Sequence, residues 1–573
     1  MNADKRRTHL VKPKILARGA LVWMLLLGGG ASAAEEPVTL DPGNYHKVNE
    51  APALASVPDG SILLFYDGPI SIEKLQNPLY MRRSVDGGYS WGPERAIARV
   101  EGRSLHCPVT VTTSEGHLHI FFNMYKGWDT EDFELCDSQM GRIISTDGGR
   151  TWTEPEQVDT GQRYHGSCRN VIQLVNGRIV LPFCFFTHEK MFRVGVVYSD
   201  DLGKTWTNSR SILDVGRDDK GKTFETGATE PVVIQLKDGR VWMLLRSTTG
   251  VQWESFSSDN GGTWSRPVPS RFISSNCPAS LLRLRDGRIV LIWSNSYTHL
   301  YSREVLNIAV SADEGKTWKG YREIVRLKPH EGPDWKLCYP YPVEDWDGNV
   351  LVAYWEFLSR KFDHARHRSF VVRVDPEWMD EVTFRENFEH GLSRASVTGS
   401  SGVRALRDPG GDVTSALSLR RMSPEAEAGA VLNFPLLDRG ELALKVRCNP
   451  DSSGLLLFLK DSFMKPKDPG NGSFAVTLSP EGGLRAGPGD GSRGSALGQL
   501  KGSLQKERWH SLRIRWDTEN KRASVFLDGH AVGDFEGSSA VTGICYVGLY
   551  AAADSPEKGS VWVADLRTAP AGF

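Results

Sequence analysis

Short apolar runs recur through the first two thirds of the chain, each directly after a turn signal. The signal is an acidic residue or Asn followed by Gly, and the six stretches read PDGSILLFY, SEGHLHIFF, VNGRIVLPF, KDGRVWMLL, RDGRIVLIW and WDGNVLVAY. Asp-Gly and Asn-Gly pairs between apolar runs are strong signals of a β-hairpin. The pattern therefore predicts six hairpins between Pro58 and Tyr354.

A second motif runs in phase with these hairpins. It has the form Ser, any residue, Asp, any residue, Gly, any residue, Thr or Ser, Trp, and its five copies read SVDGGYSW, STDGGRTW, SDDLGKTW, SSDNGGTW and SADEGKTW. Asp can accept hydrogen bonds from amides of its own turn, Gly takes a positive φ, and the Trp ring is large enough to be buried between neighbouring units. We therefore interpret each copy as a tight turn between two strands.

The spacing of this motif predicts the architecture. Its Asp residues stand at positions 86, 147, 201, 259 and 313, so that successive copies are 54 to 61 residues apart. Such a period is long enough for one four-stranded sheet. Six hairpins at this near-regular period predict an all-β region in which six sheets are arranged radially, as a six-bladed β-propeller.

The five copies of the motif resemble the Asp boxes of the sialidase superfamily, which are also called BNR repeats. The resemblance covers residues 34–380. In that superfamily the boxes lie on the outer rim of the blades, away from the catalytic face. The resemblance therefore implies that the Asp residues of the boxes are structural.

The sequence changes character after Trp378, where the boxes stop. Alternating segments follow, such as GELALKVRC, GLLLFLKD and GSFAVTLSP. The stretch RWHSLRIRWDTENKRASVFLDGHAVGDF resembles a laminin-G or concanavalin-like jelly roll, so residues 381–573 are expected to form a β-sandwich. Modules of this kind bind sugars in some proteins and are spacers or covers in others, and both roles stay open.

The N-terminus has the features of an export signal. Residues 1–33 carry six basic side chains and one acidic one, then the apolar run Ala20 to Leu27, and end on small residues at Ala33. This pattern predicts a secretory signal peptide, with an uncleaved anchor as the alternative, and hence a secreted or periplasmic protein. The run is shorter than the roughly 20 residues that a bilayer crossing needs, so no membrane span is expected in the mature chain.

Charge and cysteine content narrow the classes of partner. Without residues 1–33 the chain has 63 basic and 69 acidic residues, and nucleic acid is therefore not expected as a partner. Eight cysteines are too few for a disulfide scaffold, although export permits bridges. His106 and His165 flank two of the cysteines, but no CxxC spacing occurs, so we expect neither a metal ion nor another cofactor.

Candidate site residues are found where the innermost strand of each blade begins, because these strands converge on the propeller axis. Six residues stand eight or nine positions ahead of the turn signals, namely Glu50, Cys107, Cys168, Glu230, Cys277 and Tyr339. A phenol is a poor nucleophile until a neighbouring carboxylate takes its proton. Tyr339 and Glu230 are therefore of interest as a pair.

The resemblance implies roles for four of these positions. Tyr339 stands where the family has its nucleophile and Glu230 where it has the activating Glu, with Tyr341 as the alternative nucleophile if the register differs by two. Arg246 and Arg303 match two of the three arginines that bind the substrate carboxylate, a task that suits the two parallel N–H groups of a guanidinium. Sialidases use a Tyr nucleophile; the carboxylate on the anomeric carbon of sialic acid would repel an acidic nucleophile.

The sequence departs from the family pattern at two places. The family has Arg-Ile-Pro in the first blade, whereas this chain has Glu50, Ala51 and Pro52. An acidic residue there would repel a substrate carboxylate unless Arg169, at the entrance of the third blade, compensates. The family's acid/base Asp is also unmatched. Glu73 is the nearest carboxyl group in register and Asp67 the next, and either could protonate a leaving oxygen.

The first functional hypothesis is an exported sialidase-like exo-glycosidase that removes terminal, acidic sugars from a glycan. A second keeps the fold and site but changes the sugar, because Glu50 can accept hydrogen bonds from sugar hydroxyls. A third is a non-catalytic carbohydrate-binding protein, in which Tyr339 is a core aromatic residue and the arginines form salt bridges between blades. The sequence does not indicate the oligomeric state.

Overall fold

The computed structural model describes most of the chain from Val38 onward. The described residues are 38–39, 50–68, 76–129, 131–215, 227–296, 303–327, 335–358, 368–408, 410–423, 427–452, 454–463, 472–479, 481–489, 497–538, 543–552, 556 and 559–572. The predicted signal peptide and Glu73 lie outside these residues. Among them, no helix has the length and apolarity that a membrane crossing requires.

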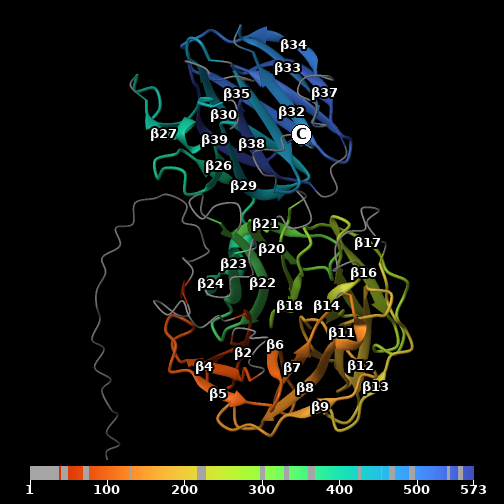
Figure 1. Cartoon of the computed structure of the whole chain (residues 1–573). Coiled ribbons are helices and arrows are strands. Elements are labelled where there is room, and N and C mark those ends of the chain that lie inside the picture. The colour runs from red at the N-terminus through yellow and green to blue at the C-terminus, as the bar shows by residue number, and fades with distance from the viewer. Residues whose placement is uncertain are drawn as a thin grey trace, which may run out of the picture. The chain divides into compact units, whose positions relative to one another are not determined.

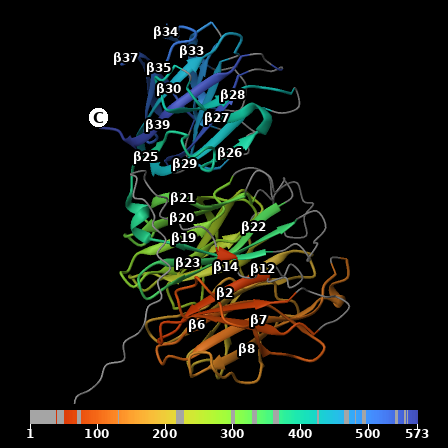
Figure 2. The ribbon, with the colours of Figure 1, turned by 90° about the vertical axis from the view of Figure 1, so that its left-hand side faces the viewer.

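Six antiparallel four-stranded sheets form the first part of the described chain (Figures 1 and 2). From the innermost strand outward, blade 1 contains β2 (Glu50–Ser56), β3 (Ile62–Asp67), β4 (Leu79–Ser84) and β5 (Arg95–Ala98). Blade 2 contains β6 (Ser104–Thr112), β7 (Leu118–Gly127), β8 (Asp137–Ser145) and β9 (Glu156–Val158). Blade 3 contains β10 (Ile172–Gln173), β11 (Ile179–Phe186), β12 (Phe192–Ser199) and β13 (Thr207–Asn208). In blades 4 to 6 the strands, in the same order, are β14 (Thr229–Gln235), β15 (Val241–Arg246), β16 (Val251–Ser257), β17 (Val268–Ile273); β18 (Ser280–Arg283), β19 (Ile289–Trp293), β20 (Val305–Ser311), β21 (Lys319–Arg326); β22 (Trp335–Glu344), β23 (Val350–Leu358), β24 (Arg368–Val374) and β1 (Val38–Thr39). The predicted six-bladed propeller is confirmed.

The propeller is closed by its own N-terminal strand. β1 supplies the outermost strand of blade 6, where Val38 pairs with Val371 and Thr39 with Phe370. Blade 6 therefore contains residues from both ends of the propeller sequence. This arrangement leaves no break in the ring of sheets that a bare chain end would otherwise create.

Each Asp box forms a compact hydrogen-bonded turn, as the sequence predicted. In the last copy the buried Ser311 hydroxyl donates to Asp313 at 2.9 Å and accepts from the amide of Gly315 at 2.8 Å. Asp313 also accepts from the amide of Thr317, at 2.8 Å, and from its hydroxyl, at 2.6 Å. All partners of the carboxylate are local, so its role in this turn is structural.

The Trp residues of the boxes join neighbouring blades. Trp152 of the blade 2 box meets Phe65 of blade 1 edge to face at 5.8 Å, and Trp206 of blade 3 meets Phe121 of blade 2 at 5.6 Å. Such aromatic pairs stabilise the fold by more than the burial of their apolar area alone. The repeat therefore supplies both the turn and the contact between sheets.

Two further sheets lie after the propeller and form the predicted β-sandwich. One contains β27 (Val403–Arg407), β28 (Ser415–Leu419), β39 (Val561–Pro570), β30 (Arg439–Cys448), β35 (His510–Asp517), β36 (Arg522–Leu527), β37 (His530–Glu536) and β25 (Phe384–Glu386). The other contains β26 (Ala395–Thr398), β29 (Gly429–Leu437), β38 (Ile544–Ala551), β31 (Leu455–Lys460), β32 (Gly472–Leu478), β33 (Gly483–Gly489) and β34 (Gly498–Ser503). Short 3-10 helices are η1 (Phe133–Leu135), η4 (Pro376–Asp380) and η5 (Ser400–Gly402).

One wall of the sandwich core follows from the strict alternation along strands such as β30. In β30, Leu442, Leu444 and Val446 are buried while their neighbours are partly exposed. Alternate side chains of a strand point to opposite faces of its sheet, so one face of β30 is apolar. This face belongs to a buried cluster with Leu457 and Val547 of the other sheet.

Propeller and sandwich share a second buried cluster within the compact unit of residues 33–573. It includes Trp293 and Tyr321 of blade 5 together with Phe458 and Tyr546 of the sandwich. Asn433 of β29 adds polar contacts: its Nδ2 donates to the carbonyl of Tyr321 at 3.0 Å. The two domains are therefore joined by packed side chains as well as by the chain.

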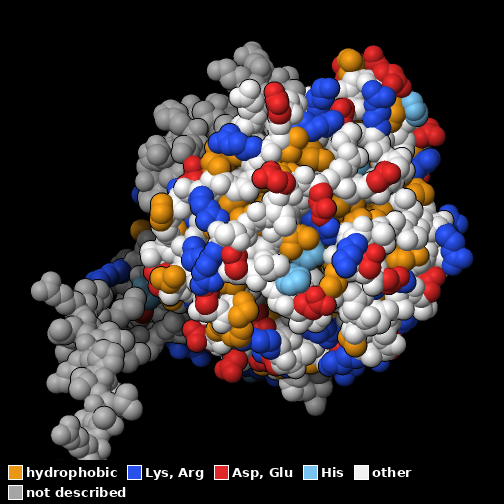
Figure 3. Space-filling view, turned by 90° about the horizontal axis from the view of Figure 1, so that it is seen from below, with side chains coloured by type: hydrophobic (Ala, Val, Ile, Leu, Met, Phe, Trp, Pro, Cys, Tyr) orange, Lys and Arg blue, Asp and Glu red, His pale blue; other side chains and the backbone are white. Residues whose placement is uncertain are grey.

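Charge on the surface is mixed on the face that Figure 3 shows, where acidic and basic side chains are interspersed. The whole chain has 69 basic and 70 acidic residues. Interspersed charges of both signs are ordinary for a solvated surface.

Candidate active site

The innermost strands of four blades share a bulge at an X-Pro dipeptide. The bulged pairs are Ala51-Pro52, Cys107-Pro108, Glu230-Pro231 and Tyr339-Pro340, and the ladder with the next strand shifts register at each. Proline has no N–H for the ladder, and a bulge changes the direction in which a side chain points. The residue before Pro has a φ of 43° to 52° in all four blades.

This geometry corrects the predicted register of the first blade. In blade 1, Ala51 has the bulge position that Cys107, Glu230 and Tyr339 have in their blades. Glu50 is one residue earlier, and its backbone pairs with Asp67 of β3. The prediction accepted residues eight or nine positions ahead of the turn signal, so it could not distinguish Glu50 from Ala51. The proline after Ala51 fixes the position of the bulge. In the other blades the partners equivalent to Asp67 are Asn123, Arg246 and Trp355.

Tyr339 and Glu230 are in direct contact, although 109 residues separate them. The phenol oxygen of Tyr339 donates to Glu230 Oε1 at 2.6 Å, and Arg246 Nη1 donates to Glu230 Oε2 at 2.5 Å. Glu230 and Arg246 are buried, and Tyr339 is half-buried. A carboxylate held by a guanidinium can thus accept a proton from the phenol.

Arg246 and Arg303 are connected through Asn276. Arg246 Nε donates to the Asn276 side-chain oxygen at 2.6 Å, and Arg303 Nε donates to the Asn276 carbonyl oxygen at 2.9 Å. Arg303 Nη1 also contacts Cys338 Sγ at 2.7 Å. The two guanidinium groups are only 2% and 4% exposed, so neither is turned outward to solvent.

The ring of Tyr339 lies between an aromatic ring and a positive charge. It stacks on Trp355 with ring centroids 5.7 Å apart, and the guanidinium carbon of Arg169 lies 4.6 Å from its centroid. Burial, and then the negative charge of Glu230, raise the pKa of Tyr339 well above its ordinary value near 10. The phenol is therefore neutral at rest and needs a base when it reacts.

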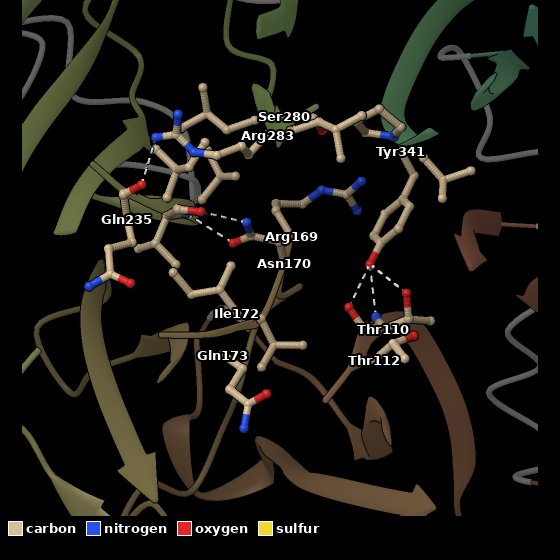
Figure 4. Close-up of a pocket in the computed structure, with 18 of the residues that line it drawn as sticks. Thr110, Thr112, Arg169, Asn170, Ile172, Gln173, Gln235, Ser280, Arg283 and Tyr341 are labelled. Atoms are coloured by element: carbon tan, nitrogen blue, oxygen red, sulfur yellow. Dashed lines mark hydrogen bonds between the residues drawn. The ribbon is translucent and has the colours of Figure 1, made fainter. Parts of the chain in front are cut away.

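Tyr341, the alternative nucleophile, lies away from Glu230. Its hydroxyl accepts from the amide of Thr110 at 2.8 Å, and it borders a cavity along the propeller axis (Figure 4). Its bonding partners belong to blade 2, and among the described contacts it has no carboxylate partner. It is therefore less suited than Tyr339 to be activated by a base.

Asp67, a sequence candidate for the acid/base, is fully buried and paired with His106. One carboxylate oxygen of Asp67 contacts His106 Nδ1 and also accepts from the amide of Cys107 at 3.2 Å. The His106 side chain is 17% exposed. Burial opposes the charged ring, but Cys107 and the Asp67 carboxylate raise the pKa of His106 well above its ordinary 6.5.

Sequence reasoning missed Asn276 and Trp355, and it considered His106 only as a metal ligand beside a cysteine. His106 and Asn276 each stand one residue before an X-Pro dipeptide of the kind that carries Glu230 and Tyr339. The dipeptide was thus a usable signal. Trp355 is placed only by strand pairing with Cys338, which the sequence does not encode locally.

The cysteines of the chain are free thiols in the structure. All eight cysteines are buried and none forms a disulfide in the structure. Within the described ranges, no group of three or more His, Cys, Asp or Glu side chains is arranged to hold a metal ion. The site brings together a phenol, carboxylates, an imidazole and guanidinium groups.

Comparison with known proteins places the fold in a family. A BNR repeat-like domain matches residues 78–352. The chain is 28% identical over 307 residues to a sialidase of Micromonospora viridifaciens, and 24% identical over 325 residues to one of Bacteroides fragilis. These matches support placing the propeller in the sialidase superfamily. The BNR match spans blades 1 to 6 of this sialidase-like propeller, from just before β4 to within β23.

The coverage of these similarities is partial. The two matches include 47% and 50% of this chain, and they span 44% and 56% of the relatives, about half their length. Among solved structures, Trypanosoma rangeli sialidase aligns with a TM-score of 0.46 at 13% identity, covering 95% of this chain and 97% of that one. Hadza microbial sialidase Hz136 aligns with a TM-score of 0.47 at 20% identity, covering 60% and 69%.

Proposed function

We propose that this protein is an exo-glycosidase that releases a terminal acidic sugar, of the sialic acid type, from a glycan. The observation that carries the proposal is the 2.6 Å hydrogen bond from Tyr339 to Glu230, with Arg246 on the other oxygen of the same carboxylate. The names of the relatives support the class of reaction. The sequence of residues 1–33 supports export as part of the same proposal.

In the first step the oxygen of Tyr339 attacks the anomeric carbon of the sugar. The phenol proton passes to Glu230 Oε1 as the new bond between oxygen and carbon forms. The bond from the anomeric carbon to the leaving oxygen breaks, and an acid gives that oxygen a proton. In the second step water attacks the anomeric carbon and gives a proton to the conjugate base of that acid, the bond to Tyr339 breaks, and Glu230 returns its proton to the phenol oxygen.

Positive charge around this pair suits a sugar that carries a carboxylate. Arg246 and Arg303 are fixed by Asn276 and have the fork geometry that pairs with a carboxylate. A neutral phenol next to such a group avoids the repulsion that an acidic nucleophile would meet. We therefore propose that these two arginines bind the carboxylate of the substrate.

The proton donor is proposed to be the pair of Asp67 and His106. Asp67 has in blade 1 the strand position that Arg246 has in blade 4, but its carboxylate is fully buried. His106 is the more exposed partner, and its raised pKa keeps the ring positively charged at neutral pH. The imidazolium would protonate the leaving oxygen while Asp67 holds the ring. Glu73 remains the other candidate for the acid/base.

One observation favours a second candidate function on the same site. Where the family has Arg-Ile-Pro, blade 1 has Glu50 before the bulge at Ala51. Arg169 does not replace the missing clamp directly, because it is buried against the ring of Tyr339. A glycan whose terminal sugar differs from sialic acid, and whose hydroxyls bind an acidic residue, is therefore the second candidate.

The proposal is tested by assaying the purified protein on sialosides and on other acidic glycosides, such as uronides. Tyr339→Phe is expected to lower the rate by about 10³-fold or more, because no oxygen is left to attack. Tyr341→Phe is the matched control and is expected to keep the rate within a few-fold. Equal rates for Tyr339→Phe and the parent would refute the mechanism, and no release from any glycoside would favour a binding protein.

A further inference from the structure

A cavity runs along the propeller axis on the side of the hairpin turns (Figure 4). It has a volume of about 510 Å³ and is walled by all six innermost strands. Arg169 and Tyr341 border it beneath the candidate active site, while Lys237 and Arg283 border it near the turns. Tyr339, Glu230 and Arg246 are not among the described residues that line it.

The charges that line this cavity have one sign. Arg169, Lys237 and Arg283 contribute positive charge, and none of the described lining residues is Asp or Glu. Arg283 and Lys237 are both paired with Glu314, at 2.8 Å and 3.5 Å. Among the described side chains, the cavity charge that is left without an acidic partner is that of Arg169.

Arg169 is an unusual buried arginine. It is 1% exposed, and Nη2 donates to the carbonyl of Pro340 at 3.3 Å. Nε has no hydrogen-bond partner, and among the side chains that the structure describes, which do not include that of Glu50, no carboxylate forms an ion pair with Arg169. Arginine is almost never fully buried unless it is paired, because removing the charge from water costs several kcal/mol.

We propose that the axial cavity binds a small inorganic anion, such as chloride, at the guanidinium of Arg169. Figure 4 shows this side chain extending across the cavity toward Tyr341. The anion supplies the missing counter-charge in a site where no acidic side chain competes with it. Halides and small oxyanions share this chemistry, and the size of the cavity admits either.

The position of Arg169 connects this anion to the candidate active site. The guanidinium carbon lies 4.6 Å from the ring centroid of Tyr339. A positive charge near a phenol favours the ionised form of the phenol. A bound anion offsets the positive charge of Arg169 and so makes ionisation of Tyr339 less favourable. Binding itself does not require that the protein be a glycosidase.

Chloride-35 NMR of the full-length protein tests the proposal, because chloride bound to a protein broadens the solvent line. The parent is expected to broaden the line, and phosphate is expected to reverse the broadening if oxyanions share the site. Arg169→Met is expected to reduce the broadening to the level caused by weak chloride binding at the protein surface. The matched control is Arg283→Met, at a cavity residue paired with Glu314. It is expected to broaden the chloride line as much as the parent does.

Equal broadening by the parent and Arg169→Met would overturn the proposal. Because a variant can fail to fold, crystals of the parent grown in bromide give a second measurement. An anomalous bromide peak beside Arg169 is expected there, and the absence of any peak in the cavity would also overturn the proposal.

Discussion

Glu230 and Tyr339 have backbone conformations that side chains rarely adopt, with φ of 45° and 51°. Such conformations cost about 1–3 kcal/mol each and persist only where the surrounding structure fixes them. Here the following proline and the bulge fix them, and the result is that the two side chains meet across the propeller axis. The spacing ahead of the turn signals and the family resemblance allowed the sequence to predict this pair, whereas the contact between Asp67 and His106 depends on strand pairing that it does not reveal.

Replacing Glu230 by Gln tests its role as the base. The amide keeps the shape but cannot take the proton of Tyr339, so the turnover rate is expected to fall by about 10²–10⁴-fold. Arg246 also loses its buried counter-charge, which is expected to lower the free energy of unfolding by up to about 3–5 kcal/mol. Glu254→Gln, at a residue that accepts from Trp242 Nε1, is the control and should keep the activity.

The pH dependence of the rate tests His106 as the proton donor. Its pKa is raised above 6.5, so the active, charged form is present below that pH and is lost as the pH rises through the raised value. The stabilisation from its pair with Asp67 is lost over the same interval. His106→Gln is expected to remove the alkaline limb of the rate profile and to slow the reaction by about 10²–10⁴-fold.

His119 provides the control for this titration. Burial lowers the pKa of His119 to about 4, so its ring is neutral wherever the protein is expected to work. His119→Gln is therefore expected to leave the alkaline limb in place. If His106→Gln keeps the alkaline limb of the rate profile, His106 is not the proton donor, and Glu73 becomes the candidate.

At the scale of elements, the Asp box is the unit that the sequence predicted best. Its bonds are local, so the residue types alone indicate the turn, and the apolar runs indicate the hairpins. The bulges were not predicted, because they depend on how the innermost strand pairs with the next one. For this reason the ring position in blade 1 was assigned to Glu50 in place of Ala51.

Ser311→Ala tests the structural role of the boxes. The substitution removes the partner of the partly buried Gly315 amide and a donor to Asp313. Leaving this amide unsatisfied is expected to lower the free energy of unfolding by about 1 kcal/mol in a denaturant titration, with activity on any substrate unchanged. Ser114→Ala, at an exposed turn serine, should change it by less than about 0.5 kcal/mol. Equal stability of the two variants would contradict this account.

At the scale of the whole molecule, the sequence predicted a propeller followed by a β-sandwich but not how they are joined. The shared cluster brings together side chains such as Trp293 and Tyr546, which are more than 250 residues apart. Each would pass as an ordinary core residue of its own domain. The jelly-roll topology and the sugar-binding role of the sandwich stay predictions.

Asn433→Ala tests the junction of the two domains. Asn433 accepts from the amide of Glu323 at 2.9 Å and donates to the carbonyls of Tyr321 and Cys545 at 3.0 and 3.1 Å. Losing these bonds is expected to cost about 1–3 kcal/mol and to lower the melting temperature in calorimetry, without a change in the catalytic site. Asn449→Ala, which removes a bond within the sandwich at 3.2 Å, controls for amide loss as such. A melting temperature unchanged in Asn433→Ala would mean that the junction adds no stability.

The most direct measurement of the central claim is the mass of the protein after reaction with a 3-fluoro glycosyl fluoride of the acidic sugar that it releases. The fluorine slows the second step, so the covalent sugar accumulates on the nucleophile. The account predicts an added mass of one sugar, located on Tyr339 after proteolysis and absent from Tyr339→Phe. An adduct on another residue, or turnover without any adduct, would contradict it.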